Sequence, residues 1–290
     1  MSFIQFARAH GVEIDPARLY PSEKIKRCGT VEKPRSRNGA YFWDGMRGWV
    51  FNWQGQAQVQ WFNDPAVKPW TEAEKAAWKA QRQAQRIRQE QGYQRAAQQA
   101  HELLRTATPG THSYLHSKGF PQAQGLIAQD GALLIPMRHH QTNALQGVQM
   151  IRWLEGERRH EKKMQPYGMK AAGAVHRMGA NNTFETCLVE GYATGLSVLE
   201  ALRGMGVQAV VLVCFSAHNL TLVAQGVHGR AYVFADHDKS GTGQDAAEQT
   251  GLPWCMSPVE GEDANDLHQR AGVLAVRQLL MRVRLQRKGT

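Results

Sequence analysis

The sequence contains few cysteines, and their spacing is not that of a disulfide framework or a metal site. Cys28, Cys187, Cys214 and Cys255 are widely separated, and no C-x-x-C pair occurs. This spacing argues against a disulfide-stabilised fold and against a zinc ribbon. Cys187 and Cys214 lie inside apolar runs, where cysteine behaves as a small hydrophobic residue.

Long apolar runs are also missing. No span of about 18 apolar residues occurs, so no transmembrane helix is predicted. The opening residues, MSFIQFARAHG, lack the apolar stretch of a secretion signal, and we expect a cytoplasmic protein with no membrane partner. The phosphate-binding pattern G-x-x-x-x-G-K-[ST] is absent too, so helicase activity is not expected of this chain.

Positive charge is in excess. The chain has 35 Lys and Arg against 25 Asp and Glu, which gives a formal net charge of +10 and a pI near 9.6. This balance favours a polyanionic partner, although a basic soluble protein without such a partner would share it. Hydrophobic residues make up 42% of the 290 residues, enough for packed cores in one large domain or two to three small ones.

Residues 1–70 are expected to form a small α+β domain rich in aromatic residues. A short helix is predicted within residues 2–20, with Ser2 as N-cap and Gly11 as its stop. The runs AYFW, WVFNW and AQVQWF follow, separated by turn residues, and predict hairpins of an antiparallel sheet. Their aromatic side chains either form the core or stack on unpaired bases, and a mixture of the two is open.

The next two segments differ sharply in character. Residues 71–108 are rich in Ala, Gln and cations but poor in large apolar residues, which predicts a polar spacer helix with a solvated basic face. Residues 109–182 are expected to form a basic subdomain in which strands 132–137 and 145–151 pair, with Pro136 at an edge position or a strand end. Its basic cluster is predicted to contact phosphates, with an ordinary basic surface as the alternative, and comprises Arg158, Arg159, His160, Lys162, Lys163 and Lys170.

Short apolar runs alternate with helical segments over residues 187–272. The predicted strands are 188–189, 209–214, 231–235 and 253–256, and the predicted helices are 192–204, 217–226, 242–250 and 264–286. This alternation indicates an α/β fold with a parallel sheet covered by helices on both faces. The last residues, 273–290, are assigned to a basic C-terminal helix.

Acidic residues follow the ends of these strands. Glu190 follows the first strand, Asp236 and Asp238 follow the third, and Asp263 and Asp266 lie in the turn after the last. Ligands bind at the carboxyl edge of such sheets, and Mg²⁺ is usually held by one or two carboxylates. We expect the Asp236–Asp238 pair to bind a divalent ion, while Glu190 takes up a proton or binds a second ion. Solvated turn residues are the alternative for each acid.

The acidic pattern carries a resemblance to a known family. The segments EGYATG, DHDKSGTGQDAA and GEDANDL, in this order, resemble the Toprim domain shared by bacterial primases, topoisomerases, nucleases and RecR-like repair proteins. EGYATG itself resembles the signature of primases from conjugative plasmids and satellite phages. The Toprim similarity covers about residues 183–272, and the basic subdomain before it looks like the primase-specific part.

The resemblance implies a fold and an activity. A Toprim-type parallel sheet flanked by helices would follow a basic α+β unit and a small antiparallel N-terminal domain. The chain would be a DNA primase, a nucleotidyltransferase that makes short RNA primers on single-stranded DNA from ribonucleoside triphosphates with Mg²⁺ or Mn²⁺. A replicative helicase or another replication protein is a further expected partner. A Toprim metal-dependent nuclease and a non-catalytic single-stranded-DNA-binding accessory are the alternatives.

The resemblance also assigns roles to residues. The catalytic carboxylates would be Glu190, Asp236 and Asp238, with Asp263 or Asp266 as an accessory metal ligand. Nucleotide phosphates would contact Lys239, Lys162, Lys163 and Lys170, and the DNA strand would contact Arg138, Arg152, Arg158 and Arg159. Many primases carry an N-terminal Cys/His zinc module, and its spacing is missing here. Either the aromatic sheet replaces that module or another protein supplies template recognition.

Overall fold

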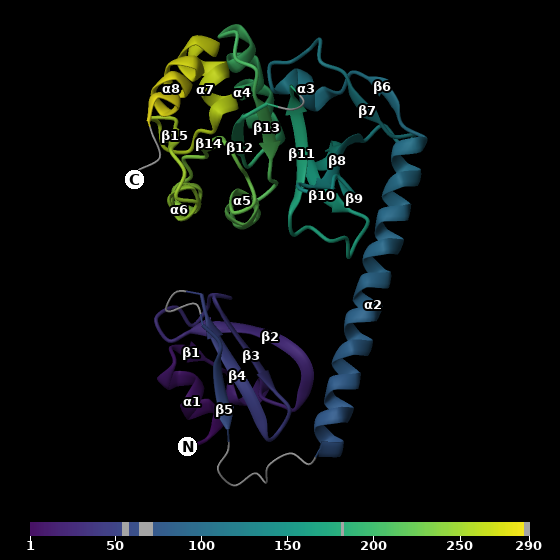
Figure 1. Cartoon of the computed structure of the whole chain (residues 1–290), viewed down its shortest axis with the longest axis vertical. Coiled ribbons are helices and arrows are strands. Elements are labelled where there is room, and N and C mark those ends of the chain that lie inside the picture. Colours follow the sequence, from purple (N-terminus) through teal and green to yellow (C-terminus); the bar gives the residue numbers. More distant parts are fainter. Residues whose placement is uncertain (54–57, 64–71, 181–182, 287–290) are drawn as a thin grey trace. The chain divides into compact units, whose positions relative to one another are not determined.

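The computed structural model describes residues 1–53, 58–63, 72–180 and 183–286, and it divides the chain into two compact units, Met1–Gln83 and Ala84–Thr290 (Figure 1). The expected domain limits at residues 70 and 182, and the last four residues of the expected C-terminal helix, lie outside the described ranges. The finer division of the second unit at residues 108, 182 and 272 stays a prediction. Within the described ranges no helix is both long and apolar enough to cross a membrane.

The first unit is an antiparallel sheet with one helix against it. Its elements are α1 (Phe3–Ala9), β1 (Val12–Glu13), the 3₁₀ turn η1 (Pro16–Arg18), β2 (Ser22–Thr30), β3 (Gly39–Trp43), β4 (Arg47–Asn52) and β5 (Gln60–Asn63). The described strands pair in the order β1-β2-β3-β4-β5, which confirms the predicted hairpins. Ser2 caps α1 in a capping box with Gln5, as its position predicts. The helix ends at Ala9, beside the predicted stop Gly11, whose φ of +75° turns the chain into β1.

A single long helix, α2 (Glu72–Arg105, 34 residues), follows. Its early turns are exposed, as expected of a spacer, but its last turns are apolar on one side. Ala100, Leu103 and Leu104 pack against Leu134 and Met150 in the second unit. The last turns of α2 therefore belong to a hydrophobic core of the second unit, which a helix that is polar nearly all round would not provide.

The second unit contains one continuous mixed sheet. Its strands are β6 (Thr108–Gly110), β7 (Gly125–Ile127), β8 (Leu133–His139), β9 (Leu145–Leu154), β10 (Arg159–Gln165), β11 (Ala174–Gly179), β12 (Glu185–Val189), β13 (Val210–Val213), β14 (Arg230–Ala235) and β15 (Trp254–Met256). Among the described residues the order is β10-β9-β8-β11-β13-β12-β14-β15, with β6 and β7 paired beside β8. Strands β12 to β15 run parallel, and β11 joins them antiparallel to β13. The expected basic subdomain and the parallel sheet thus share one hydrogen-bonded layer.

Helices cover both faces of the parallel part, as the apolar strands predict (Figure 1). The α4 (Tyr192–Gly204), α7 (Ala264–Ala271) and α8 (Val273–Leu285) helices cover one face, and α5 (Ala217–Ala224) and α6 (Thr242–Gln249) cover the other. The prediction of one helix over 264–286 is wrong. Gly272 adopts φ +78° and separates α7 from α8, a conformation that costs glycine little.

Both positions predicted for Pro136 are also wrong, because β8 lies inside the sheet and Pro136 is in the middle of that strand. Pro136 is paired with Val148 of β9. On its other side, β8 pairs with β7 at Leu133–Leu134 and with β11 at Arg138–His139, so Pro136 falls in the gap between these pairings. Its carbonyl oxygen there lies 3.1 Å from Nδ1 of His176. Proline has no backbone N–H to donate. No strand in the described ranges pairs with β8 at Pro136 on this side, so the missing donor leaves no hydrogen bond unmade, just as at the edge of a sheet.

Candidate active site

The backbone around Glu190 is fixed at the end of β12. The carbonyl of Val189 accepts the N–H of Cys214, and the carbonyl of Glu190 accepts the N–H of Phe215, each at 2.8 Å. Gly195, in the first turn of α4, lets that helix approach the sheet closely. A Cβ at this position would lie 2.5 Å from Met178 Cε and 2.8 Å from Val213 Cγ2. The EGYATG segment is therefore a tight strand–helix junction that presents Glu190 at the carboxyl edge.

Asp236 follows β14 at the same edge. Its Oδ1 atom is buried and has no hydrogen-bond partner among the described residues. Burial raises the pKa of Asp236 to about 8, and the negative charges of Asp263, Glu190, Asp238 and Asp266 add to the increase. These four carboxylates therefore act on Asp236 from three separate loops. A buried carboxylate without a partner is costly unless a proton or a cation neutralises it.

Asp238 holds the loop that leads into α6. Its Oδ1 accepts the Ser240 N–H at 2.9 Å and the Ser240 hydroxyl, and its Oδ2 accepts the Gly243 N–H at 2.8 Å. The Ser240 hydroxyl and these backbone donors lower the pKa of Asp238, so it is ionised at neutral pH. A Cβ on Gly243 would lie 2.2 Å from the Asp236 carbonyl oxygen. Glycine is thus required where α6 approaches Asp236.

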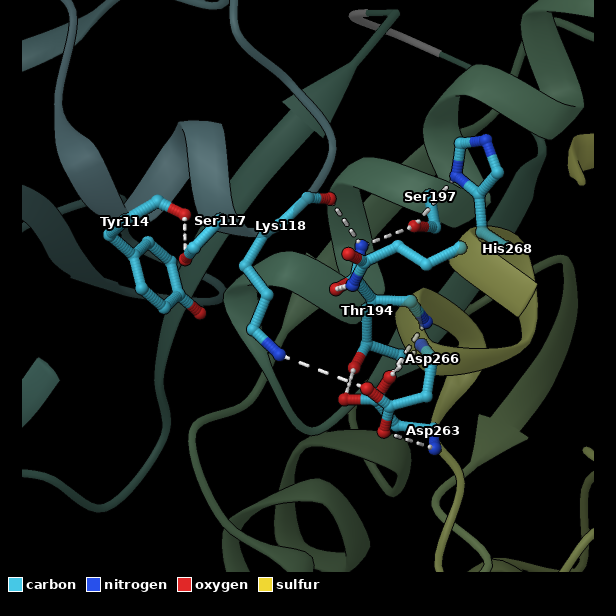
Figure 2. Close-up of polar contacts among 10 residues, drawn as sticks. Tyr114, Ser117, Lys118, Thr194, Ser197, Asp263, Asp266 and His268 are labelled. Atoms are coloured by element: carbon cyan, nitrogen blue, oxygen red, sulfur yellow. Dashed lines mark hydrogen bonds and ion pairs between the residues drawn. The ribbon is translucent and has the colours of Figure 1, made fainter. Parts of the chain in front are cut away.

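Two further acids come from the start of α7 (Figure 2). Asp263 is the N-cap of α7 and accepts the N–H groups of Asn265 and Asp266 at 2.7 and 2.9 Å. Its Oδ2 also accepts the Thr194 hydroxyl at 3.1 Å, which links EGYATG to α7. Asp266 lies 3.9 Å from Lys118 Nζ. Of these two candidates, Asp263 has the stronger effect on the pKa of Asp236.

Several residues that position this edge carried no prediction. His237 donates its N–H to the Glu262 carbonyl at 3.0 Å, and its Nδ1 lies 2.9 Å from the Ser257 carbonyl oxygen. It therefore fixes the acidic loop beside β14. Buried Asn265 donates to the Lys118 carbonyl at 2.8 Å and to Ser197 Oγ at 3.1 Å. These hydrogen bonds join segments that are far apart in the sequence, so their partners could not be predicted from it. Only Asn265 and His237 could have been singled out, because they lie within the acidic motifs.

The predicted cation cluster is split by the alternation of β10. Lys162 pairs with Ile151, whose side chain belongs to the core that contains Tyr114, and Lys162 Nζ lies 5.1 Å from the Tyr114 ring centroid. Lys163 pairs with Met150, which packs toward α2 on the opposite face. Neighbours in a strand point to opposite faces, so only one of the two lysines faces the acids.

Electrostatics identify Lys162 as that lysine. Burial raises the pKa of Glu190, Asp238 adds to the increase, and Lys162 opposes both. The other cations of β9 and β10 have acidic partners of their own: Lys163 with Glu161 at 2.9 Å, Arg152 with Asp130 at 2.5 Å, and Arg159 with Glu157 at 2.6 Å.

The remaining predicted phosphate and DNA contacts are dispersed. Arg138 donates to the Asn143 carbonyl at 3.1 Å, and Lys170 Nζ lies 6.0 Å from the Tyr93 ring centroid of α2. Arg158 occupies the left-handed turn between β9 and β10, at φ +49°. Lys239 is exposed directly after Asp238. Of these four, only Lys239 is adjacent to an acid of the site.

The carboxylates are suitable ligands for a hard divalent cation, but they do not come together as a complete coordination site. Among the described residues, no three His, Cys, Asp or Glu side chains approach closely enough to hold a metal ion. The unpartnered Oδ1 of Asp236 and the carboxylates around it are nevertheless oxygen donors of the kind that Mg²⁺ prefers. Since Mg²⁺ completes its shell with water and substrate phosphates, one or two of these acids are enough.

Comparison with known proteins adds a domain assignment. No curated protein matches the chain. Among solved structures, the DnaG primase catalytic domain bound to single-stranded DNA is similar at 16% sequence identity and a TM-score of 0.36, over 67% of this chain and 73% of that one. Residues 185–273 match the family model of the Toprim domain, which confirms the Toprim domain predicted from the sequence.

Proposed function

We propose that this chain is a DNA primase of the EGYATG type, which makes short RNA primers on single-stranded DNA by nucleotidyl transfer with Mg²⁺ or Mn²⁺. One observation carries the proposal: a buried Asp236 oxygen, with no hydrogen-bond partner in the described part of the chain, lies at the edge of a Toprim sheet, where burial and four other carboxylates raise the pKa of Asp236. Such an edge favours binding of a cation together with a polyphosphate. The excess of positive charge supports a polyanionic substrate.

The acids divide into distinct roles in this proposal. Asp236 and Asp238 would hold the ion, with Asp263 or Asp266 as an accessory ligand, and the ion would offset charge on the reacting phosphate. Glu190 has a raised pKa, which suits it to take the proton from the attacking 3′-hydroxyl. The donors from Ser240, Thr242 and Gly243 keep Asp238 ionised, so its charge is available to the ion.

Cations on both faces of β10 would hold the DNA strand and the incoming nucleotide. Lys162 is placed to offset phosphate charge beside Glu190, as an electrostatic contact to the transition state. The ion pairs of Lys163, Arg152 and Arg159 are exposed, and such pairs are worth only about 0–1 kcal/mol. Phosphates can therefore displace the acidic partners. Lys170, Lys239, Arg138 and Arg158 are the other candidates for these contacts.

The test is incubation of the protein with circular single-stranded DNA, labelled ribonucleotides and Mg²⁺. We expect short labelled RNA from the wild type and none from Asp236→Ala, with strand binding retained. Asp245→Ala is the matched control, because Asp245 is an exposed carboxylate on α6 and is not among the charges that shift Asp236. Full primer yield from Asp236→Ala would contradict the assignment of the site.

A metal-dependent nuclease is the second candidate, because it would use the same carboxylates on the same sheet. The same incubation separates the two functions. Loss of the circular template without RNA synthesis would select the nuclease. A retarded but unchanged template, with no dependence on Mg²⁺, would select a non-catalytic binding role.

A further inference from the structure

The two faces of the N-terminal sheet are both aromatic, but only one of them forms the core. The core face packs against α1 and includes Tyr41, Val50 and Phe62. Pairing between β3, β4 and β5 places Phe42 opposite Trp49, and Trp49 opposite Trp61. Because side chains alternate along strands, these three rings share the other face. We call this second face the aromatic face; it comprises Phe42, Trp49, Phe51, Trp53 and Trp61.

Two rings of the aromatic face are exposed, and the other three, Phe42, Trp49 and Phe51, are half-buried. Trp61 is 59% exposed and Trp53 is 46% exposed. Phe42 and Trp49 stack with ring centroids 6.5 Å apart and an interplanar angle of 19°. Phe51 and Trp53 meet edge to face at 4.5 Å. The aromatic face therefore keeps apolar ring surface accessible on the side of the sheet away from its core, and exposed apolar surface of this kind is typical of binding sites.

Positive charge accompanies these rings. The Arg27 guanidinium lies 3.7 Å from the Trp53 ring centroid and is held there by a hydrogen bond from Nε to the Arg37 carbonyl at 2.9 Å. Arg47 starts β4 on the same face, two residues before Trp49. Residues 1–53 contain nine Lys and Arg against five Asp and Glu. The aromatic face is therefore flat, apolar and bordered by cations.

We propose that the aromatic face binds single-stranded DNA by stacking unpaired bases on its rings, while nearby arginines contact the phosphates. Each base has a π-face, so aromatic rings bind single strands with little sequence preference, and a sheet surface can present two or three such rings at once. The cations match the charge of a phosphate backbone, which an apolar protein partner would not require. The choice of DNA as the strand rests on the proposed function; the stacking surface itself does not.

The test measures stacking separately from charge. The full chain is titrated with a labelled oligo-dT of roughly 12 nucleotides and with an abasic strand of equal length, a size within the usual range for such surfaces. Replacing Trp61 or Trp49 with Leu is expected to weaken oligo-dT binding about 5- to 100-fold and to leave abasic binding unchanged, since stacking is worth about 1–3 kcal/mol per base. Trp61→Phe keeps a ring and is expected to retain most of the affinity.

Two controls separate this site from the acidic one. Phe184→Leu removes a ring that is 87% exposed in the second unit and should change neither affinity. Asp236→Asn should abolish nucleotide incorporation but keep the difference between oligo-dT and abasic DNA, so failure of the proposed function would not remove this binding. Equal losses for both strands in the Leu variants, or no loss for either, would overturn the proposal. A change in oligomeric state without a change in oligo-dT affinity would also overturn it and indicate self-association.

Discussion

Asp236 keeps a proton at neutral pH in the folded, metal-free protein, because burial and four neighbouring carboxylates disfavour its charge. In the unfolded chain the same group ionises near its ordinary pKa of about 3.9. The folded state therefore binds the extra proton between about pH 4 and pH 8, and stability from this group falls as pH rises through that window. The acidic site is a source of instability until a cation binds.

Asp236→Asn should remove this cost. We expect the free energy of unfolding of the variant to equal that of the wild type near pH 4 and to exceed it by on the order of 5 kcal/mol at pH 8 without metal. The pKa of Asp236 rises from 3.8 to about 8, and each pKa unit corresponds to about 1.36 kcal/mol. Urea unfolding in the presence of a chelator, from pH 4 to pH 9, measures the difference. Added Mg²⁺ should stabilise the wild type more than the variant. A difference that stays flat with pH would show that Asp236 is ionised in the folded protein.

Gly243 offers a second test at the scale of one residue. Its Cβ position is blocked by the Asp236 carbonyl oxygen, so Gly243→Ala must displace α6 from the site. We expect a loss of on the order of 1–3 kcal/mol, typical of overpacking, together with loss of activity. Gly92→Ala is the matched control, because no described atom lies within 4 Å of its Cβ position in α2. The free energy of unfolding of that variant, measured by thermal denaturation, should rise by up to about 1 kcal/mol.

The positions of Glu190 and Asp236 were predictable because strand ends are local features of sequence. Short apolar runs end one residue before each acid, and parallel strands end at a common edge. The contact of Thr194 with Asp263 was not predictable, since the two are joined only by the packing of α4 against α7. The same holds for Lys118, which reaches Asp266 from a different part of the chain.

At the scale of elements, β10 decides which cation reaches the acids. Lys162 lowers the pKa of Glu190, so Lys162→Ala should raise that pKa and move the acidic limb of the pH–rate profile to higher pH. We also expect a loss in kcat on the order of 100-fold, as for removal of a transition-state contact. Steady-state primer synthesis from pH 6 to pH 9 measures both.

Lys163→Ala is the control for this prediction. It removes the same charge from the same strand, but on the face directed toward α2. We expect weaker strand binding and an unchanged pH profile. Identical profiles for the two variants would show that Lys162 acts only through its net charge.

The elements that were predicted wrongly share a cause. The apolar period of residues 264–286 continues through Gly272, so periodicity alone cannot reveal that the backbone there turns to φ +78°. Pro136 was assigned to an edge because an inner strand normally needs its N–H, and the gap between β7 and β11 depends on strand order. Strand order and ladder gaps are set by long-range pairing, which a single sequence does not display.

At the scale of the whole molecule, the described residues form separate cores in the two units. Val50 is fully buried in the first unit and Leu188 is fully buried in the second. We expect calorimetry to resolve two unfolding transitions, one for each unit. Val50→Ala should destabilise only the first unit and Leu188→Ala only the second, and each should lower the free energy of unfolding by on the order of 2–4 kcal/mol. A single transition that both variants lower equally would show that the units unfold together.

The adjacent lysines of β10 have a consequence for how such chains diverge. A one-residue deletion in the turn before β10 would shift its register and reverse the face of every side chain in it. His160 would then leave its place beside Ser113, but a lysine would still face Glu190, because Lys163 would take the position of Lys162. This hairpin can therefore lose one residue and still keep a positive charge facing Glu190, whereas a one-residue insertion would bring Glu161 to that position.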